Sequence, residues 1–204
     1  KDKEYYRHTH GGVTVSGGEP LAQNPAGLSS LLTTFKEDGL HVTVETAGDV
    51  PWRTFETSMP FVDLFLFDLK LVGDPVRHDE LTGRDGWRVE DNLRRLVAAG
   101  ATVQVRMCVV PGHNDTRANV EATATLLQSI GHETIELMRY YDLHESKAAR
   151  MELSQAPLHI TAERSLRALG AVAEAVRSRG NNVRAEDPGA LRRAPTFTRR
   201  VHEL

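Results

Sequence analysis

Two adjacent glycines and a carboxylate follow a β-prone run near the beginning of the sequence. The run at 13–16 ends in Ser16 and is followed by Gly17, Gly18 and Glu19. Glycines allow the backbone to approach a ligand closely, with its N–H and C=O groups free to bond it. A carboxylate at the same turn can form a charge-assisted hydrogen bond with an ammonium. A glycine pair alone is typical of any tight turn after a strand, whereas the added carboxylate suits a ligand that carries an ammonium.

Charged and polar residues also end other β-prone runs. Asp68 and Lys70 alternate with an apolar residue, so in a strand both side chains point to the same side. At that spacing they can pair with each other in a structural ion pair or contact charged groups of a ligand. Glu45, Thr46 and Arg106 lie near the ends of two further runs. Taken alone, the pair Glu45 and Thr46 is equally typical of a solvated turn.

Lys70 also allows an unrelated chemistry, the Schiff base of an α/β-barrel aldolase. That role requires a desolvated lysine with a lowered pKa. The carboxylate of Asp68, two residues away, favours the charged form of the lysine instead. We therefore rank the aldolase interpretation last.

The hydrophobic pattern places these residues on alternating strands and helices. Strands are expected at 13–16, 41–46, 64–69, 102–110 and 134–140, with a weaker sixth at 182–185. The first helix follows an Asn24 cap and Pro25, and it and three later helical patterns end at a glycine. Asn114 or Asp115 is expected to cap the helix after the fourth strand. Such alternation predicts a parallel sheet whose polar strand ends meet at one edge.

Composition excludes several functions. The 204 residues carry a net charge of -3, so bulk electrostatics favour neither nucleic acid nor a membrane surface. No apolar run is long enough to span a bilayer, and no signal peptide is visible. The one cysteine, Cys108, cannot form an internal disulfide and fits a reducing cytoplasm. Because it lies in an apolar strand, we expect a packed thiol.

Five segments resemble motifs of the radical S-adenosylmethionine enzymes that activate glycyl radical enzymes, of which pyruvate formate-lyase activating enzyme is the best known. Residues 11–23 read GGVTVSGGEPLAQ and are similar to that family nearly residue for residue. Residues 42–48, 63–70 (D-x-x-x-x-D-L-K) and 106–115 resemble three further strand ends. In the fifth segment, 136–147, the matching residues are Tyr140, Leu143 and Lys147. Arg139, Tyr141 and His144 stand where the family usually has Pro, His and Gly.

The resemblance implies a fold and ligands. The expected fold is a partial (β/α) barrel of about five parallel strands with outer helices and the first strand missing. It covers 1–188, and 189–204 form an arginine-rich C-terminal tail. The residues implied to bind S-adenosylmethionine are Ser16, Gly17, Gly18, Glu19, Glu45, Thr46, Asp68, Lys70 and Arg106. Lys70 and Arg106 are the catalytic candidates, and His78 and Tyr141 are implied to contact the protein substrate.

The implied partners are a glycyl radical enzyme and a flavodoxin or ferredoxin-type electron donor. The family holds a [4Fe–4S] cluster through a CxxxCxxC motif, which the single cysteine of this chain cannot supply. We therefore expect no metal ligands here, and no reaction from this chain alone. Because the sequence lacks an initiator Met, we interpret it as part of a longer enzyme. The alternative is a cluster-less pseudoenzyme that binds S-adenosylmethionine or a protein partner.

Overall fold

The computed structural model describes residues 12–141 and 158–185. In this part of the chain, six strands form one parallel sheet whose spatial order follows the sequence. The strands are β1 (Gly12–Val15), β2 (His41–Thr46), β3 (Leu64–Leu69), β4 (Val103–Val109), β5 (Thr134–Arg139) and β6 (Asn182–Ala185). Each expected strand is confirmed to within one residue at either end, and the weaker sixth is a full member of the sheet.

Four long helices connect the strands where periodicity predicts them. They are α2 (Pro25–Glu37), α5 (Gly86–Ala98), α6 (Arg117–Ser129) and α8 (Ala162–Arg177). The shorter η1 (Pro20–Ala22), α3 (Trp52–Ser58), η2 (Met59–Phe61) and α4 (Pro75–Thr82) were not expected. Helix α4 is mostly polar and buries only His78, so it carries no apolar period to detect. The expected cap of α6 is wrong: Thr116, not Asn114 or Asp115, accepts from the N–H of Asn119.

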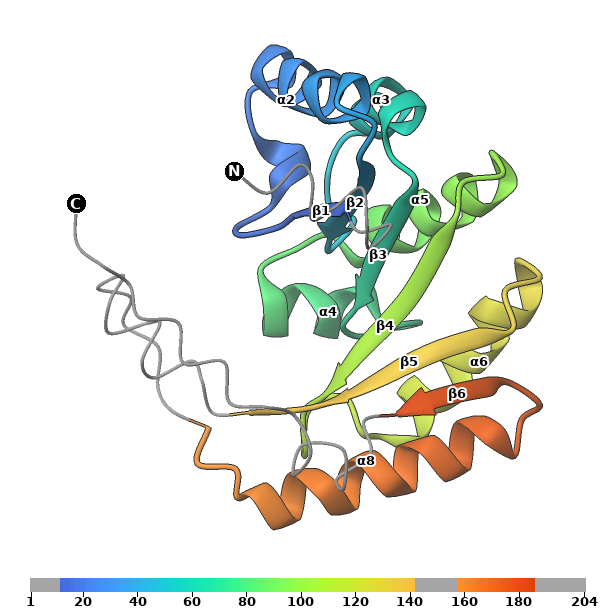
Figure 1. Ribbon diagram of the computed structural model, residues 1–204. Helices are drawn as coiled ribbons and strands as arrows, with labels where there is room; N and C mark the ends of the chain where they lie inside the picture. Colours follow the sequence, from blue (N-terminus) through green and yellow to red (C-terminus); the bar gives the residue numbers. More distant parts are fainter. Residues whose placement is uncertain (1–11, 142–157, 186–204) are drawn as a thin grey trace.

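The sheet is an open, partial (β/α) barrel. Right-handed crossovers between strands in sequential order place the helices on one side of the sheet. Figure 1 shows α2, α3, α5, α6 and α8 along the outer side of the fanned strands. We call the opposite side of the sheet the inner face.

Alternation along the strands separates an apolar outer face from a polar inner face. In β3, Phe65, Phe67 and Leu69 are fully buried, while Leu66 and Asp68 between them are half-buried. The buried set packs with residues of the outer helices, such as Leu32 and Leu93, into one core. The residues pointing the other way are free to form a site. The predicted orientation of Asp68 opposite to Leu69 is confirmed.

Asp63, the first acid of the D-x-x-x-x-D-L-K motif, has a structural position at the start of β3. Both carboxylate oxygens lie 2.7 Å from Nζ of Lys36, and one also accepts from the N–H of Val42 at 2.7 Å. Burial acts to raise the pKa of Asp63, but Lys36 and the Val42 N–H outweigh it, and the pKa is lowered. The carboxylate thus ties α2 and β2 to β3.

Replacing Asp63 with asparagine should lower the free energy of unfolding by roughly 1–2 kcal/mol, since the pair is about one-third exposed and partly screened. A lowered folded-state pKa stabilises above the unfolded pKa, and this stability disappears as pH falls through the folded pKa. Urea unfolding should therefore separate Asp63→Asn from the wild type at about pH 7 but much less at about pH 3. An equal difference at both pH values would contradict the ionic role.

Candidate functional site

Arg106 is the centre of a charged cluster on the inner face. Its Nε donates to Oδ1 of Asp68 at 2.8 Å, and its second guanidinium nitrogen donates to Oε1 of Glu45 at 2.5 Å. Asp68 and Arg106 are direct partners in the pairing of β3 with β4. The side chains of Arg106 and Asp68 are only 12% and 14% exposed. The sheet thus holds two carboxylates around one guanidinium.

This arrangement favours the charged forms of Glu45 and Arg106. Burial acts to raise the pKa of Glu45, but the hydrogen bond and charge of Arg106 lower it below its usual value, aided by Ser16 and Lys70. Burial acts to lower the pKa of Arg106, and the two carboxylates raise it. The perturbing groups lie on, or directly after, β1, β2, β3 and β4, so four of the five strand ends predicted to converge do lie together. The fifth, at Tyr140 and Tyr141 after β5, contributes no group to these shifts.

Lys70 extends the cluster toward the carboxyl edge of the sheet. Its Nζ lies 3.4 Å from Oδ2 of Asp68, and its side chain is 40% exposed. Of the two alternatives left open by the sequence, the structure shows the ion pair with Asp68. An exposed, paired ammonium is the opposite of the desolvated lysine that an aldolase requires, so this geometry disfavours the Schiff-base alternative.

The glycine-rich turn joins this cluster through Glu19. Ser16, Gly17 and Gly18 are exposed, and Gly17 has a φ of 125°, which strongly favours glycine. The two oxygens of Glu19 accept from the N–H of Leu21 at 3.2 Å and of Ala47 at 2.9 Å. Glu19 therefore caps η1 and clamps the turn to the loop after β2. The residues next to Glu19 in the sequence predict a contact with a ligand. They give no sign of its hydrogen bond with Ala47, which lies 28 residues away.

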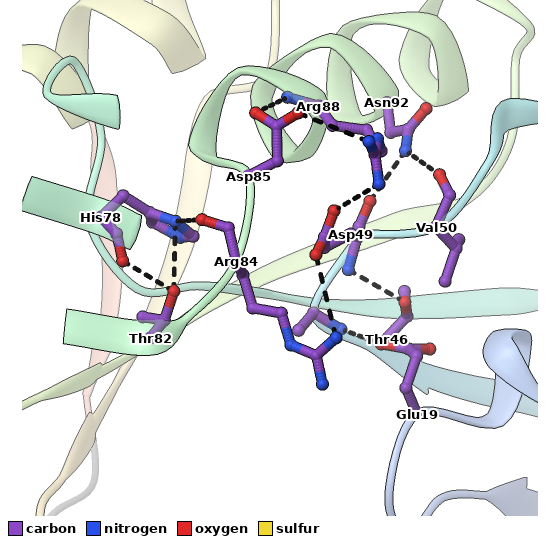
Figure 2. A network of polar contacts seen from close by, with 12 residues as sticks. Glu19, Thr46, Asp49, Val50, His78, Thr82, Arg84, Asp85, Arg88 and Asn92 are labelled. Atoms are coloured by element: carbon purple, nitrogen blue, oxygen red, sulfur yellow. Dashed lines mark hydrogen bonds and ion pairs between the residues drawn. The ribbon is translucent and has the colours of Figure 1, made fainter. Parts of the chain in front are cut away.

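Thr46 is directed into that loop. Its hydroxyl is the acceptor for the N–H of Gly48 at 3.0 Å, and the residue is 2% exposed. Figure 2 shows Thr46, the last residue of β2, close to the carboxylate of Glu19. A direct contact between Thr46 and a cofactor stays a prediction, while Glu45, one residue earlier, is half-buried beside Arg106.

A row of alternating charges continues across the inner face. Strand pairing places Asp68, Arg106, Glu136 and Arg184 side by side on β3, β4, β5 and β6. The amide of Gln104 donates to the carboxylate of Glu136. Sequence analysis missed Glu136 and Arg184, although each lies at an inward position of its strand. The inner face is therefore charged beyond the four strands named above.

Other predicted residues lie apart from the cluster. Cys108 is half-buried on the inner side of β4, between the buried Met107 and Val109, so the packing expected for its thiol is partial. Because its two neighbours point outward, the Cys108 side chain lies on the inner face, as that of Arg106 does. The guanidinium of Arg139 stacks 4.0 Å over the ring of Tyr141. Leu143, His144, Lys147 and the tail at 189–204 lie outside the described residues.

His78 is buried at the junction of α4 and α5. Its Nδ1 lies 3.0 Å from the backbone oxygen of Arg84, and its ring packs where a side chain at Gly86 would stand. The residue is 2% exposed, and Nε2 has no partner among the described residues. His78 therefore joins two helices in this structure, and its contact with a protein substrate stays a prediction.

Metal and membrane binding can be examined in the same residues. Among 12–141 and 158–185, no group of three or more His, Cys, Asp or Glu side chains could hold a metal ion. None of the described helices has the length and apolarity required to cross a bilayer.

Comparison with known proteins gives a consistent family, although no family model matches the chain. The isethionate sulfite-lyase activating enzyme of Nitratidesulfovibrio vulgaris is 38% identical over 149 residues, covering 72% of this chain and 48% of the relative. The (2S)-3-sulfopropanediol dehydratase activating enzyme of Klebsiella oxytoca is 34% identical over 156 residues, covering 75% and 49% respectively. The chain is a homologue of glycyl radical enzyme activating enzymes. The resemblance of its motifs to this family is thus confirmed.

Solved structures add the fold of this activating-enzyme homologue. A crystal structure of a domain of pyruvate-formate lyase-activating enzyme from Bacteroides vulgatus aligns with a TM-score of 0.66 at 25% identity. The alignment covers 87% of this chain and 99% of that domain. SuiB of Streptococcus suis, solved with S-adenosylmethionine, shares the fold with a TM-score of 0.65 at 14% identity, over 86% and 39%. The homologue spans about half the length of the first two relatives named above.

Proposed function

We propose that this chain forms the S-adenosylmethionine-binding and partner-binding part of a glycyl radical enzyme activating enzyme. The observation that carries the proposal is the meeting of the glycine turn with the cluster of Glu45, Asp68 and Arg106 at one edge of the sheet. In the family, bound S-adenosylmethionine supplies a 5′-deoxyadenosyl radical that removes a hydrogen atom from a glycine of the partner enzyme.

The charges of the cluster suit this ligand. S-adenosylmethionine carries an ammonium, a sulfonium and a carboxylate, so its net charge is positive. Glu19, Glu45 and Asp68 contribute three negative charges against the two positive charges of Lys70 and Arg106. The difference leaves one negative charge, which attracts the ligand. Glu19 and Glu45 would hold the ammonium, and Lys70, the more exposed cation, would pair with the carboxylate.

The glycine turn and Arg106 have supporting roles in the proposal. Exposed backbone at Gly17 and Gly18 lets the amino-acid moiety approach the turn closely. Arg106 is almost fully engaged by Asp68 and Glu45, so it fixes the positions of these two carboxylates. It acts as an organiser of the site, and any direct ligand contact by Arg106 is secondary.

The residues of this chain do not fit a [4Fe–4S] cluster. Such a cluster is held by cysteine thiolates, and the sequence contains one cysteine. We therefore assign no electron-transfer step to these residues. The proposed protein partner is a glycyl radical enzyme, in line with the names of the relatives. The flavodoxin or ferredoxin-type electron donor stays a prediction.

Titration calorimetry with S-adenosylmethionine tests the proposal. We expect weak binding, because the contacts that a [4Fe–4S] cluster would make with S-adenosylmethionine are missing. Cys108 provides a second readout because it is the only thiol and lies on the inner face. Bound S-adenosylmethionine should slow alkylation of Cys108 several-fold in the wild type and leave it unchanged in Glu19→Ala. Absence of binding at millimolar ligand would reject the site, and binding without protection would place the ligand elsewhere.

A further inference from the structure

The loop after β2 is held from two opposite sides. On the side of the glycine turn, the carboxylate of Glu19 accepts from the N–H of Ala47. On the other side, the amide of Asn92 in α5 donates to the carbonyl oxygens of Gly48 at 2.7 Å and Val50 at 2.8 Å. In Figure 2, Asn92 lies above Asp49 and Val50 of this loop, and Glu19 lies below them. Backbone groups of Ala47, Gly48 and Val50 thus bond to side chains that are distant in the sequence.

Asp49 gives the same loop an ionic attachment to α5. Its carboxylate is 11% exposed and lies 3.0 Å from Arg88, which also approaches Asp85, the capping residue of α5, at 3.5 Å. The more exposed Arg84 is 3.9 Å from the other oxygen of Asp49. The start of α5 is therefore bound to the loop by both hydrogen bonds and charge.

The backbone of the loop has little conformational freedom between these attachments. Gly48 has a φ of 83°, and a Cβ there would lie 2.3 Å from the ring of Phe67. Asn92 is 1% exposed, so its two bonds are made in an environment where unpaired carbonyls are costly. Removing the side-chain amide of Asn92 would deprive the carbonyl oxygens of Gly48 and Val50 of this hydrogen-bond donor. The loop would then lose its attachment to α5.

We propose that Asn92 and Asp49 are positioning residues for ligand binding, although neither belongs to the charged cluster. They set the position of Ala47, whose N–H orients the carboxylate of Glu19, and of Glu45 two residues before it. This inference rests on the proposed function, because it concerns the loop that shapes the proposed S-adenosylmethionine site. It adds residues of α5 to that site.

Amide hydrogen exchange of the ligand-free protein tests the positioning by itself. Asn92→Ala should raise exchange at the amides of Ala47 and Gly48 at least tenfold. The matched control is Asn181→Ala, which removes another buried asparagine at the opposite edge of the sheet. That control should lower the melting temperature without changing exchange at Ala47. Unchanged exchange in Asn92→Ala would overturn the proposal whether or not the protein binds S-adenosylmethionine.

Calorimetry of variants tests the consequence for binding. Asn92→Ala should weaken S-adenosylmethionine binding about tenfold at a temperature where it remains folded, whereas Asn181→Ala should stay within about twofold. Combining Asn92→Ala with Glu19→Gln should weaken binding by less than the product of the separate effects, because both act on one loop. If Asn92→Ala does not fold, Asp49→Asn should show the same pattern with a smaller effect. Unchanged affinity or fully multiplicative effects would overturn the proposal. A wild type that binds no S-adenosylmethionine would instead reject the proposed function.

Discussion

Arg106→Ala should lower the free energy of unfolding by about 2–4 kcal/mol, because removal of one member of a buried charge cluster leaves the others unpaired. Asp68, the more enclosed carboxylate, loses its bond at 2.8 Å, and Glu45 loses its bond at 2.5 Å. S-adenosylmethionine binding should weaken as well, since the two carboxylates no longer have fixed positions. Urea unfolding at neutral pH measures the first effect and calorimetry the second.

The pH dependence of the unfolding free energy tests whether the loss of stability in Arg106→Ala is electrostatic. In the wild type, the pKa of Glu45 is lowered, so its contribution to stability is present above the unfolded pKa and is lost as pH falls through the folded pKa. Without Arg106, the burial of Glu45 favours its neutral form. The stability gap between Arg106→Ala and the wild type should therefore narrow as pH falls.

A charge-neutral triple variant provides the control. Arg106→Met with Glu45→Gln and Asp68→Asn removes the unpaired charges and should recover most of the stability without recovering ligand binding. A gap that is constant with pH, or a triple variant as unstable as Arg106→Ala, would contradict the electrostatic account.

Glu19→Ala should reduce S-adenosylmethionine binding at least about a hundredfold, equivalent to about 2.7 kcal/mol. Two losses combine in this variant. The charge proposed to attract the ligand ammonium disappears, and the N–H groups of Leu21 and Ala47 lose their acceptor. Glu37→Ala, which removes an exposed glutamate at the end of α2, is the matched control and should bind as the wild type does.

Glu19→Gln separates the two losses. The glutamine keeps one oxygen for a backbone N–H but carries no charge, so its binding should fall between the wild type and Glu19→Ala. Calorimetry of the wild type, Glu19→Gln and Glu19→Ala at one ionic strength measures the order of their affinities for S-adenosylmethionine. Equal affinity of wild type and Glu19→Ala would reject the assignment of Glu19 to the site.

The sequence by itself determined the strands, the long helices and the polar nature of the inner face. These features depend on local alternation: Phe65, Phe67 and Leu69 alternate with inward residues, and the helices repeat apolar residues at helical spacing. The pairing of Asp68 with Lys70 was also predictable, because alternation along one strand brings them to one side. The resemblance to glycyl radical enzyme activating enzymes was evident from the motif at 11–23, and the similar known proteins bear it out.

Only the tertiary structure decided which of these residues meet. The row of Asp68, Arg106, Glu136 and Arg184 depends on the register between four strands, and a shift of one residue would send a side chain to the other face. The clamp from Glu19 to Ala47 and the support from Asn92 join segments separated by 28 and by more than 40 residues. Local preferences carry no information on such pairs, because their partners are backbone groups common to every residue. The charges that suggest a ligand are therefore readable in the sequence, whereas the residues that hold them in place are visible only in the fold.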